Sequence, residues 1–574
     1  MNKRRLLLLG GLAILLVCAC ATVFMFMLPG GDDEQETTQR AADVVETNEE
    51  LEGNSTPQQQ EEIAPADDSA EIESTDESIS VPTDKPEPTV EPTPTDEPTA
   101  TPVPPQGMSR GNPFPIDTIV EAPNWNVQVI EVVRGDEAWS QIQAANQFND
   151  PPLEGMEYVL IKVKAVSTHS DSESHFISGS DFGITGDKLI YYRPTSVVAP
   201  EPELSAELFS GGETEGWIPF SIGEGEESLI LVVDEILNFD EDRRRFIAIE
   251  ENTSIVADPS LFDIDPTSLG MSRSAPAPIG DTVVTDDWEI TVTDMVRGEE
   301  AWAIVQTTNQ FNEPPAEGME YVAVELQVRY IGTDERTVNI SGADFSLTGE
   351  FNILYNWPSI VDPEPALDVY LYPGGQYDGW TVMEAREDEG HLMVRFAPLF
   401  EFSDDQVRYL AIVDQASVSI PAELAEIEPN GLGEERSDPA PLGETVITDE
   451  WEFTILEVVR GNEALAMAQQ ANQFNDPPEP GTEYVAIKVR VRNIDTQDSP
   501  EDVSDSFFKT VDDTNVEYDL PSVVDPDPAL DISLYPDGEY EGWVVLQASE
   551  GGNDLIAVVS PLFSFETYYM ALEP

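Results

Sequence analysis

The feature that most constrains this chain is a sequence that is written three times, at a spacing of 163 residues. Four landmarks recur at this spacing: Trp125/Trp288/Trp451, Asn146/Asn309/Asn472, Gly155/Gly318/Gly481 and Trp217/Trp380/Trp543. The register holds without a gap from Pro115, Pro278 and Pro441 to Phe239, Phe402 and Phe565. Chance does not produce such a register over about 125 residues, so the three copies share one fold. A period this long indicates three whole domains in a row.

Within each copy, apolar and polar residues alternate in several short segments, which is the period of a strand with one buried face. The first of these starts at the early tryptophan, as in Trp125–Val129, Trp288–Val292 and Trp451–Ile455. Another strand is expected at each late tryptophan, directly after a glycine that we expect to end a turn (Gly216, Gly379, Gly542). About seven short strands per copy predict an all-β sandwich of two sheets. The early tryptophans are expected in its core.

One short helix is predicted between the first two strands of each copy. The residues at 136–145, 299–308 and 462–471 lack Pro and Gly and begin with acidic or amide side chains. Each stretch is followed by the same segment, Asn-Gln-Phe-Asn-Asp/Glu-Pro-Pro. We expect this segment to stop the helix, with Asn in a left-handed conformation and Phe plugging the core beneath.

The copies resemble the telokin-like family of bacterial extracellular domains. The resemblance rests on Gly-x-Glu-Tyr-Val, as at Gly155–Val159, Gly318–Val322 and Gly481–Val485, and on the later segment from Tyr372 to Trp380. It implies three tandem immunoglobulin-like β-sandwich domains, common in lipoproteins and anchored surface proteins, with no assigned activity. The predicted domains are repeat 1 (111–255), repeat 2 (270–415) and repeat 3 (436–574).

The N-terminal residues 1–30 are predicted to be a membrane anchor. Lys3, Arg4 and Arg5 precede an apolar run from Leu6 to Leu28, whose 23 residues suffice to cross a bilayer as a transmembrane helix. The alternative is a lipoprotein signal with lipidation at Cys20, because Val17–Cys20 is similar to a lipobox. Either anchor places the repeats outside the membrane.

Residues 31–110 are predicted to be a disordered acidic linker. They hold 22 acidic and three basic residues, with many Pro and Thr, and too little apolar surface to offset the entropy of ordering. The whole chain has a formal net charge of -86, which excludes nucleic acid as a general partner because a polyanion is repelled. Both cysteines lie before this linker, so the repeats cannot contain a disulfide.

The inventory of reactive residues disfavours an enzyme. None of the three histidines (His169, His175, His391) recurs at the repeat spacing, and no phosphate-binding glycine loop is present. The candidate ligand-binding residues are the amides and acids of the helix-stop segment, because such oxygens bind Ca²⁺ or sugar hydroxyls: Asn146, Asn149, Asp150, Asn309, Asn312, Glu313, Asn472, Asn475 and Asp476. A second candidate is the loop at 359–365 and 522–528, where repeat 1 has Ala199 in place of Asp362 and Asp525. No metal site is predicted there.

These observations predict a membrane-anchored extracytoplasmic binding or scaffold protein without catalytic activity or resident cofactor. Its partner would be a protein or glycan at the cell surface. The alternative is a calcium- or carbohydrate-binding accessory module of a cell-surface assembly. Three near-equal copies favour repeated binding over one active site, since tethered weak sites gain avidity.

Overall fold

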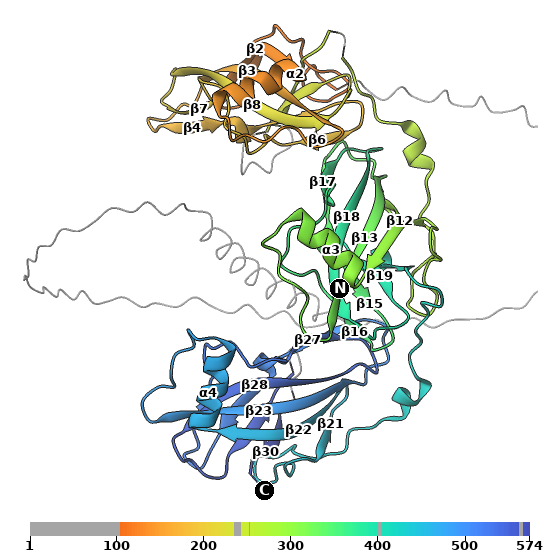
Figure 1. Cartoon of the computed structure of the whole chain (residues 1–574), viewed down its shortest axis with the longest axis vertical. Coiled ribbons are helices and arrows are strands. Elements are labelled where there is room, and N and C mark those ends of the chain that lie inside the picture. Colours follow the sequence, from red (N-terminus) through yellow and green to blue (C-terminus); the bar gives the residue numbers. More distant parts are fainter. Residues whose placement is uncertain (1–103, 235–242, 252, 400–402, 562–565, 574) are drawn as a thin grey trace, which may run out of the picture. The chain divides into compact units, whose positions relative to one another are not determined.

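The structure is a computed structural model that describes residues 104–234, 243–251, 253–399, 403–561 and 566–573. These residues lie in one compact unit, Glu97–Pro574, and they are predominantly β (Figure 1). The predicted anchor and almost all of the predicted linker lie outside the described residues. Within the described part of the chain, no helix is both long enough and apolar enough to cross a membrane.

The same order of elements occurs three times, with equivalent bounds. Repeat 1 contains β1 (Val120–Glu121), β2 (Trp125–Arg134), α2 (Asp136–Ala145), β3 (Met156–Ser167), β4 (His175–Ser178), β5 (Phe182–Thr185), β6 (Ile190–Tyr192), β7 (Ser205–Leu208), β8 (Glu213–Gly223), β9 (Ile230–Val233) and β10 (Arg245–Ala248). Repeat 2 contains β11 (Val283–Val284), β12 (Trp288–Arg297), α3 (Glu299–Thr308), β13 (Met319–Tyr330), β14 (Val338–Ser341), β15 (Phe345–Thr348), β16 (Ile353–Leu354), β17 (Asp368–Leu371), β18 (Gln376–Arg386), β19 (Met393–Phe396) and β20 (Arg408–Ala411).

Repeat 3 contains β21 (Thr445–Ile447), β22 (Trp451–Arg460), α4 (Asn462–Ala471), β23 (Thr482–Asn493), β24 (Glu501–Ser504), β25 (Phe508–Val511), β26 (Glu517–Tyr518), β27 (Asp531–Leu534), β28 (Glu539–Ser549), β29 (Ile556–Val559) and β30 (Tyr568–Ala571). Short 3-10 helices are η1 (Gly179–Asp181), η3 (Pro259–Asp263), η4 (Gly342–Asp344), η5 (Asp404–Gln406), η6 (Ala422–Glu426) and η7 (Asp505–Phe507). The three α-helices have the bounds that the sequence predicts.

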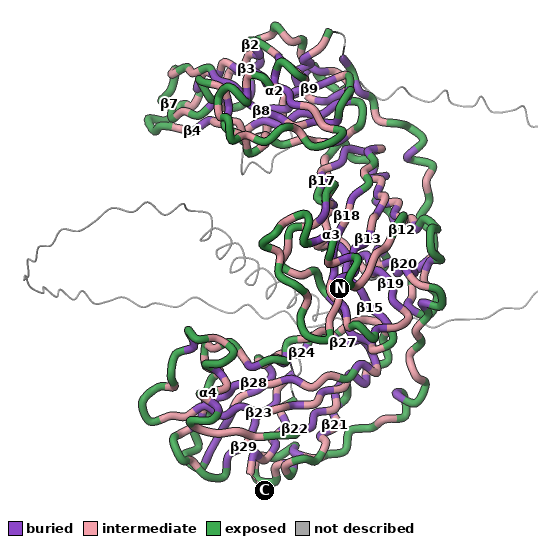
Figure 2. Tube along the Cα trace, viewed as in Figure 1, coloured by how far each residue is buried: buried purple, intermediate pink, exposed green. Residues whose placement is uncertain are grey.

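Each repeat has a four-stranded antiparallel sheet made of its three longest strands and one short edge strand. The orders are β1-β2-β3-β8, β11-β12-β13-β18 and β21-β22-β23-β28. A smaller sheet faces it, built in repeat 1 around β5, β9 and β10. Apolar side chains of both sheets form one core, in which Val127 and Ile161 of the first sheet share a cluster with Leu231 of the second. Figure 2 shows the long strands largely buried and the loops around the helices exposed.

The prediction that the early tryptophans belong to the core is confirmed. Trp125, Trp288 and Trp451 are each only 3% exposed. The prediction for the glycines before the late tryptophans is wrong, because Gly216 lies inside β8, opposite Val163 of β3, rather than at the end of a turn. A β-carbon on Gly216 would lie 2.3 Å from the backbone nitrogen of Leu204, so glycine is required where a second backbone segment crosses the strand.

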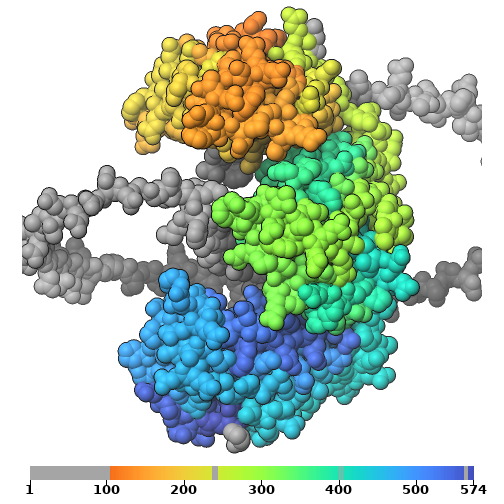
Figure 3. All heavy atoms as spheres, viewed as in Figure 1, coloured from red at the N-terminus to blue at the C-terminus, as the bar shows by residue number. Residues whose placement is uncertain are grey.

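Consecutive repeats share sheet hydrogen bonds. β6 of repeat 1 pairs with β17 of repeat 2, and β16 of repeat 2 pairs with β27 of repeat 3. The first pairing joins six strands into one sheet of order β10-β9-β5-β6-β17-β14. Figure 3 shows green atoms of repeat 2 in contact with blue atoms of repeat 3.

The start of repeat 1 lies earlier than the sequence suggests. Arg110, which the predicted linker includes, is fully buried. The described residues begin at 104. The backbone of Gly107 is hydrogen-bonded to the backbones of Asn112 and Phe246. The prediction of a predominantly β chain is confirmed, whereas the immunoglobulin-like assignment and the remaining domain limits stay predictions.

Candidate functional site

The segment after each helix is the most distinctive part of the repeat, and it begins where α2 ends. Ala145 is the last helical residue, and the backbone N–H of Asn146 still donates to the carbonyl of Ile142. Asn146 has φ of -148°, so the predicted left-handed conformation is wrong and the chain leaves the helix extended. The Asn146 side-chain oxygen accepts the backbone N–H of Phe148 at 3.0 Å, which closes a tight turn.

A single asparagine then fastens this turn to a neighbouring loop. Asn149 Nδ2 donates to the carbonyls of Ile142 and Val198, both at 2.9 Å, and Oδ1 accepts the N–H of Val198 at 3.0 Å. Asn312 makes the same three bonds in repeat 2, and Asn475 makes them in repeat 3. We call this three-bond contact the asparagine clamp. It uses both amide protons and the amide oxygen, so this side chain is committed to holding the loop.

The clamp holds a phenylalanine out into solvent. Phe148, Phe311 and Phe474 are 81%, 80% and 81% exposed, so the prediction that Phe plugs the core is wrong. The clamped neighbour is apolar and half exposed in every repeat: Val198 (50%), Val361 (48%) and Val524 (51%). Each repeat therefore carries one apolar projection, a Phe with a Val on the loop fastened beside it, which we call the Phe tip.

The acidic residue after the clamp is exposed, and its backbone is also fixed. The hydroxyl of Tyr158 donates to the carbonyl of Asp150 at 3.0 Å, and Tyr321 and Tyr484 do the same to Glu313 and Asp476. Burial raises the pKa of the Tyr158 hydroxyl, which keeps it protonated as a donor. The carboxylates of the three acids remain at the surface beside each Phe tip.

The nine predicted ligand residues thus lie in one turn per repeat, where the asparagine side chains bond to the backbone and the acids are exposed. Among the described residues, no three His, Cys, Asp or Glu side chains gather to hold a metal ion. Calcium binding stays a prediction, which a rise in melting temperature on adding Ca²⁺ would support.

The second candidate loop has a structural explanation for its aspartates. The carboxylate of Asp362 accepts the backbone N–H of Val382 at 3.1 Å, and Asp525 accepts that of Val545 at 2.7 Å. Burial raises the pKa of these carboxyls to about 6 and about 7.

In repeat 1 both members of this pair change together. Ala199 replaces the aspartate, and Pro219, which has no N–H, replaces the donor. The aspartate is therefore present where a buried N–H needs an acceptor.

The histidines of repeat 1 lie together, which the sequence did not predict. The rings of His169 and His175 are stacked with centroids 3.5 Å apart, His169 Nδ1 is 3.1 Å from Ser167 Oγ, and His175 is paired with Asp171. Ser167 is only 2% exposed. Asp171 contacts His175, whereas Ser167 contacts His169. The order of a nucleophilic triad, serine to base to acid, is not formed by these contacts.

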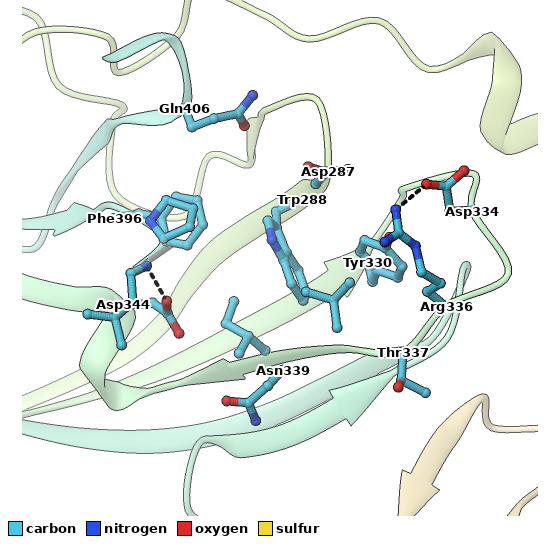
Figure 4. Close-up of a pocket in the computed structure, with 14 residues that line it drawn as sticks. Asp287, Trp288, Tyr330, Asp334, Arg336, Thr337, Asn339, Asp344, Phe396 and Gln406 are labelled. Carbon is cyan, nitrogen blue, oxygen red and sulfur yellow. Dashed lines mark hydrogen bonds and ion pairs between the residues drawn. The ribbon is translucent and has the colours of Figure 1, made fainter. Parts of the chain in front are cut away.

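A pocket of about 570 Å³ opens at one end of repeat 2 (Figure 4). Trp288 and Tyr330 line it, with ring centroids 5.2 Å apart. Asp344 at its edge accepts the backbone N–H groups of Ser341 and Leu399, at 2.8 and 3.0 Å, and Arg336 is paired with Asp334. Burial raises the pKa of the Asp344 carboxyl. Asp344, Asp334 and Arg336 are thus engaged with one another and with the backbone, while the rings of Trp288 and Tyr330 form the aromatic part of the lining.

Comparison with known proteins agrees with the repeat as the unit. A family model described as a domain of unknown function (DUF4352) matches residues 277–407 and 440–567, which lie in repeats 2 and 3. The chain therefore contains a repeated domain of unassigned function, as the sequence predicts, and the telokin-like assignment stays a prediction. No curated protein matches the chain.

Two solved structures from Bacillus subtilis are similar to parts of the chain. The YjhA protein matches at 18% identity and a TM-score of 0.18, over 24% of this chain and 99% of that one. YcdA, described as a candidate lipoprotein, matches at 11% identity and a TM-score of 0.18, over 23% of this chain and 38% of that one. The chain thus spans well under half the length of YcdA.

Proposed function

We propose that this chain is a non-catalytic binding protein whose three Phe tips engage a protein partner outside the cell membrane. The observation that carries the proposal is the phenylalanine that is about 80% exposed in all three repeats, on a turn held by the asparagine clamp. A large aromatic side chain held in water in the same place three times contributes nothing to the core. It is the kind of anchor that fills a pocket on a partner.

The surroundings of the tip define the partner. Each Phe is followed two residues later by an exposed acid, and the whole chain has a formal net charge of -86. The matching surface is an apolar pocket with a rim of Lys or Arg, because a basic rim gains from charge complementarity. The clamp fixes the tip before binding, so little conformational entropy is lost on contact. Three tips on one chain convert weak single contacts into avidity.

The proposed location follows from the N-terminus. The apolar run Leu6–Leu28 would anchor the chain directly, or lipidation at Cys20 would do so, with the acidic linker between membrane and repeats. Fractionating cells and adding external protease tests this part. Repeats cleaved on intact cells support it, and repeats that stay protected contradict it.

Photo-crosslinking tests the binding role. Phe148, Phe311 and Phe474 are replaced, one at a time, by benzoylphenylalanine in the full chain in its native host. Phe262, which is 72% exposed and outside the tips, is the matched control. We expect the three tip positions to give an adduct with the same protein, and position 262 to give none with it.

Three outcomes would refute the proposal. They are adducts that do not differ between the tips and position 262, adducts that contain glycan alone, and the absence of any adduct at the tips.

A further inference from the structure

The contact between consecutive repeats is built twice in the same way. Leu371 of β17 pairs with Ile190 of β6, and Leu534 of β27 pairs with Ile353 of β16, which is the same register one repeat later. The next residue, Tyr372 or Tyr535, donates its backbone N–H across the contact at 2.8 Å. We call this contact the joint. It is an addition of one strand edge to another.

A buried arginine lies in each joint. Arg110 is fully buried, pairs with Glu335 of the following repeat at 3.2 Å, and lies 3.8 Å from the ring centroid of Tyr372. Arg273 repeats this arrangement with Asp498 at 2.7 Å and Tyr535 at 3.7 Å. A desolvated guanidinium between a carboxylate and an aromatic face makes the joint specific.

A glycine lets the two backbones approach in each joint. A β-carbon on Gly375 would lie 2.8 Å from the carbonyl oxygen of Leu189, and one on Gly538 would lie 2.7 Å from that of Asn352. The joint is therefore a repeated, sterically matched interface between an acceptor end, which carries the arginine, and a donor end, which carries the tyrosine.

Among the described residues, no strand of another repeat pairs with the acceptor end of repeat 3. β26 is the terminal strand of its sheet, in the order β26-β25-β29-β30. Val516 holds the place of Ile190 and Ile353, which are 9% and 3% exposed in their joints, yet Val516 is 50% exposed. Arg436 holds the place of Arg273 and is only partly buried, with its guanidinium donating to the carbonyl of Asp512.

Repeat 1 has the complementary donor end. Within the part of the chain that the structure describes, β7 pairs only with β4, in a two-stranded sheet. Phe209 holds the place of Tyr372 and Tyr535, which are 1% and 0% exposed, yet Phe209 is 64% exposed. Gly212 keeps the position of the close-approach glycine. Two positions of the donor end differ: Phe209 replaces the tyrosine, and Ser172 stands in place of Glu335, with Glu173 as the neighbouring acid.

We propose that the acceptor end of repeat 3 binds the donor end of repeat 1 in a second copy of this chain. The argument is continuity with an interface that the chain already makes twice: the same strand edges, the same aromatic position and the same arginine position are all present at the two ends. Phe209 would stack on Arg436 as Tyr372 stacks on Arg110, and Glu173 would supply the carboxylate. The contact is head-to-tail, so copies add in a row or close into a ring.

Register-specific crosslinking tests this proposal on the full chain. Leu208 and Val516 hold the places of the paired residues Leu371 and Ile190, so their side chains would lie opposite each other across the joint. The double variant L208C/V516C should form a ladder of disulfide-linked dimers, trimers and larger species under mild oxidation. The pair E207C/V516C is the matched control, because neighbouring residues of a strand point to opposite faces.

We expect the control pair to crosslink at least about tenfold more slowly, since disulfide geometry is strict. Sedimentation velocity of the unoxidised chain should show mass growing with concentration, and V516K and F209S should each abolish that growth while leaving the far-ultraviolet circular dichroism unchanged. Single-cysteine variants account for the native Cys18 and Cys20. Equal crosslinking in both registers, or a wild-type chain that stays monomeric at its highest soluble concentration, would overturn the proposal.

Discussion

The carboxyl of Asp525 offers a direct test of how burial controls stability in this fold. It lies near β28, accepts the backbone N–H of Val545, and has a pKa raised from 3.8 to about 7, chiefly by burial and further by Asp505 and Asp531. The unfolded chain would titrate it near its ordinary value. Between these two pH values the folded state binds more protons than the unfolded state, so stability falls as pH rises through this window.

The expected magnitude follows from the size of that window. A pKa shift of one unit corresponds to about 1.4 kcal/mol. If the whole shift of Asp525 acts on stability, the free energy of unfolding falls by on the order of 4 kcal/mol as the pH rises above 7. Because Asp525 keeps some contact with solvent, we expect about 2–4 kcal/mol. D525N removes the charge and keeps an oxygen for the Val545 N–H. It should therefore stabilise repeat 3 at pH 8 and change little at pH 4.

The assay is hydrogen exchange of peptides from β28 across a urea series at several pH values, corrected for intrinsic exchange rates. D525A also removes the charge, but it leaves the Val545 N–H without its acceptor. It should therefore stabilise repeat 3 at pH 8 less than D525N does. D525A/V545P reproduces the Ala199 and Pro219 pair of repeat 1. It should recover the stability that D525A loses, because the N–H is removed together with its acceptor. Equal pH dependence in D525N and the wild type would refute the reasoning.

Three further predictions concern the clamp, the joint and the crossing glycine. N312D removes the two amide donors and places a carboxylate against two backbone carbonyls, so it should destabilise the tip of repeat 2 by about 2–4 kcal/mol. This loss should appear as faster hydrogen exchange in residues 358–361. The control N309D keeps its acceptor oxygen and should change little. R273M should weaken the joint of repeats 2 and 3 by about 3–5 kcal/mol, measured as lost protection of β27 against hydrogen exchange. The control R336M breaks an exposed ion pair and should cost under about 1 kcal/mol. G216A should lower the urea midpoint of repeat 1 by overpacking worth about 1–3 kcal/mol, and an unchanged midpoint would contradict the crossing described above.

Much of each repeat could be predicted from local pattern. The helices begin and end where the absence of Pro and Gly indicates, and the tryptophans that start the alternating strands are buried. The candidate turn was also found from its repetition. The outward direction of its phenylalanine could not be predicted, because Phe is usually a core residue. It points outward because Asn149 bonds the turn to a loop 49 residues away.

The sequence by itself determined that one β-rich unit is built three times, because register over a whole domain and a two-residue period depend only on order along the chain. The tertiary structure alone decided which positions face a neighbour. Arg110 lies in an acidic, proline-rich stretch by composition, yet it is buried against Glu335, 225 residues away. Strand edges, the exposed Phe tips and the joints between repeats arise from such long-range contacts, which no local pattern encodes.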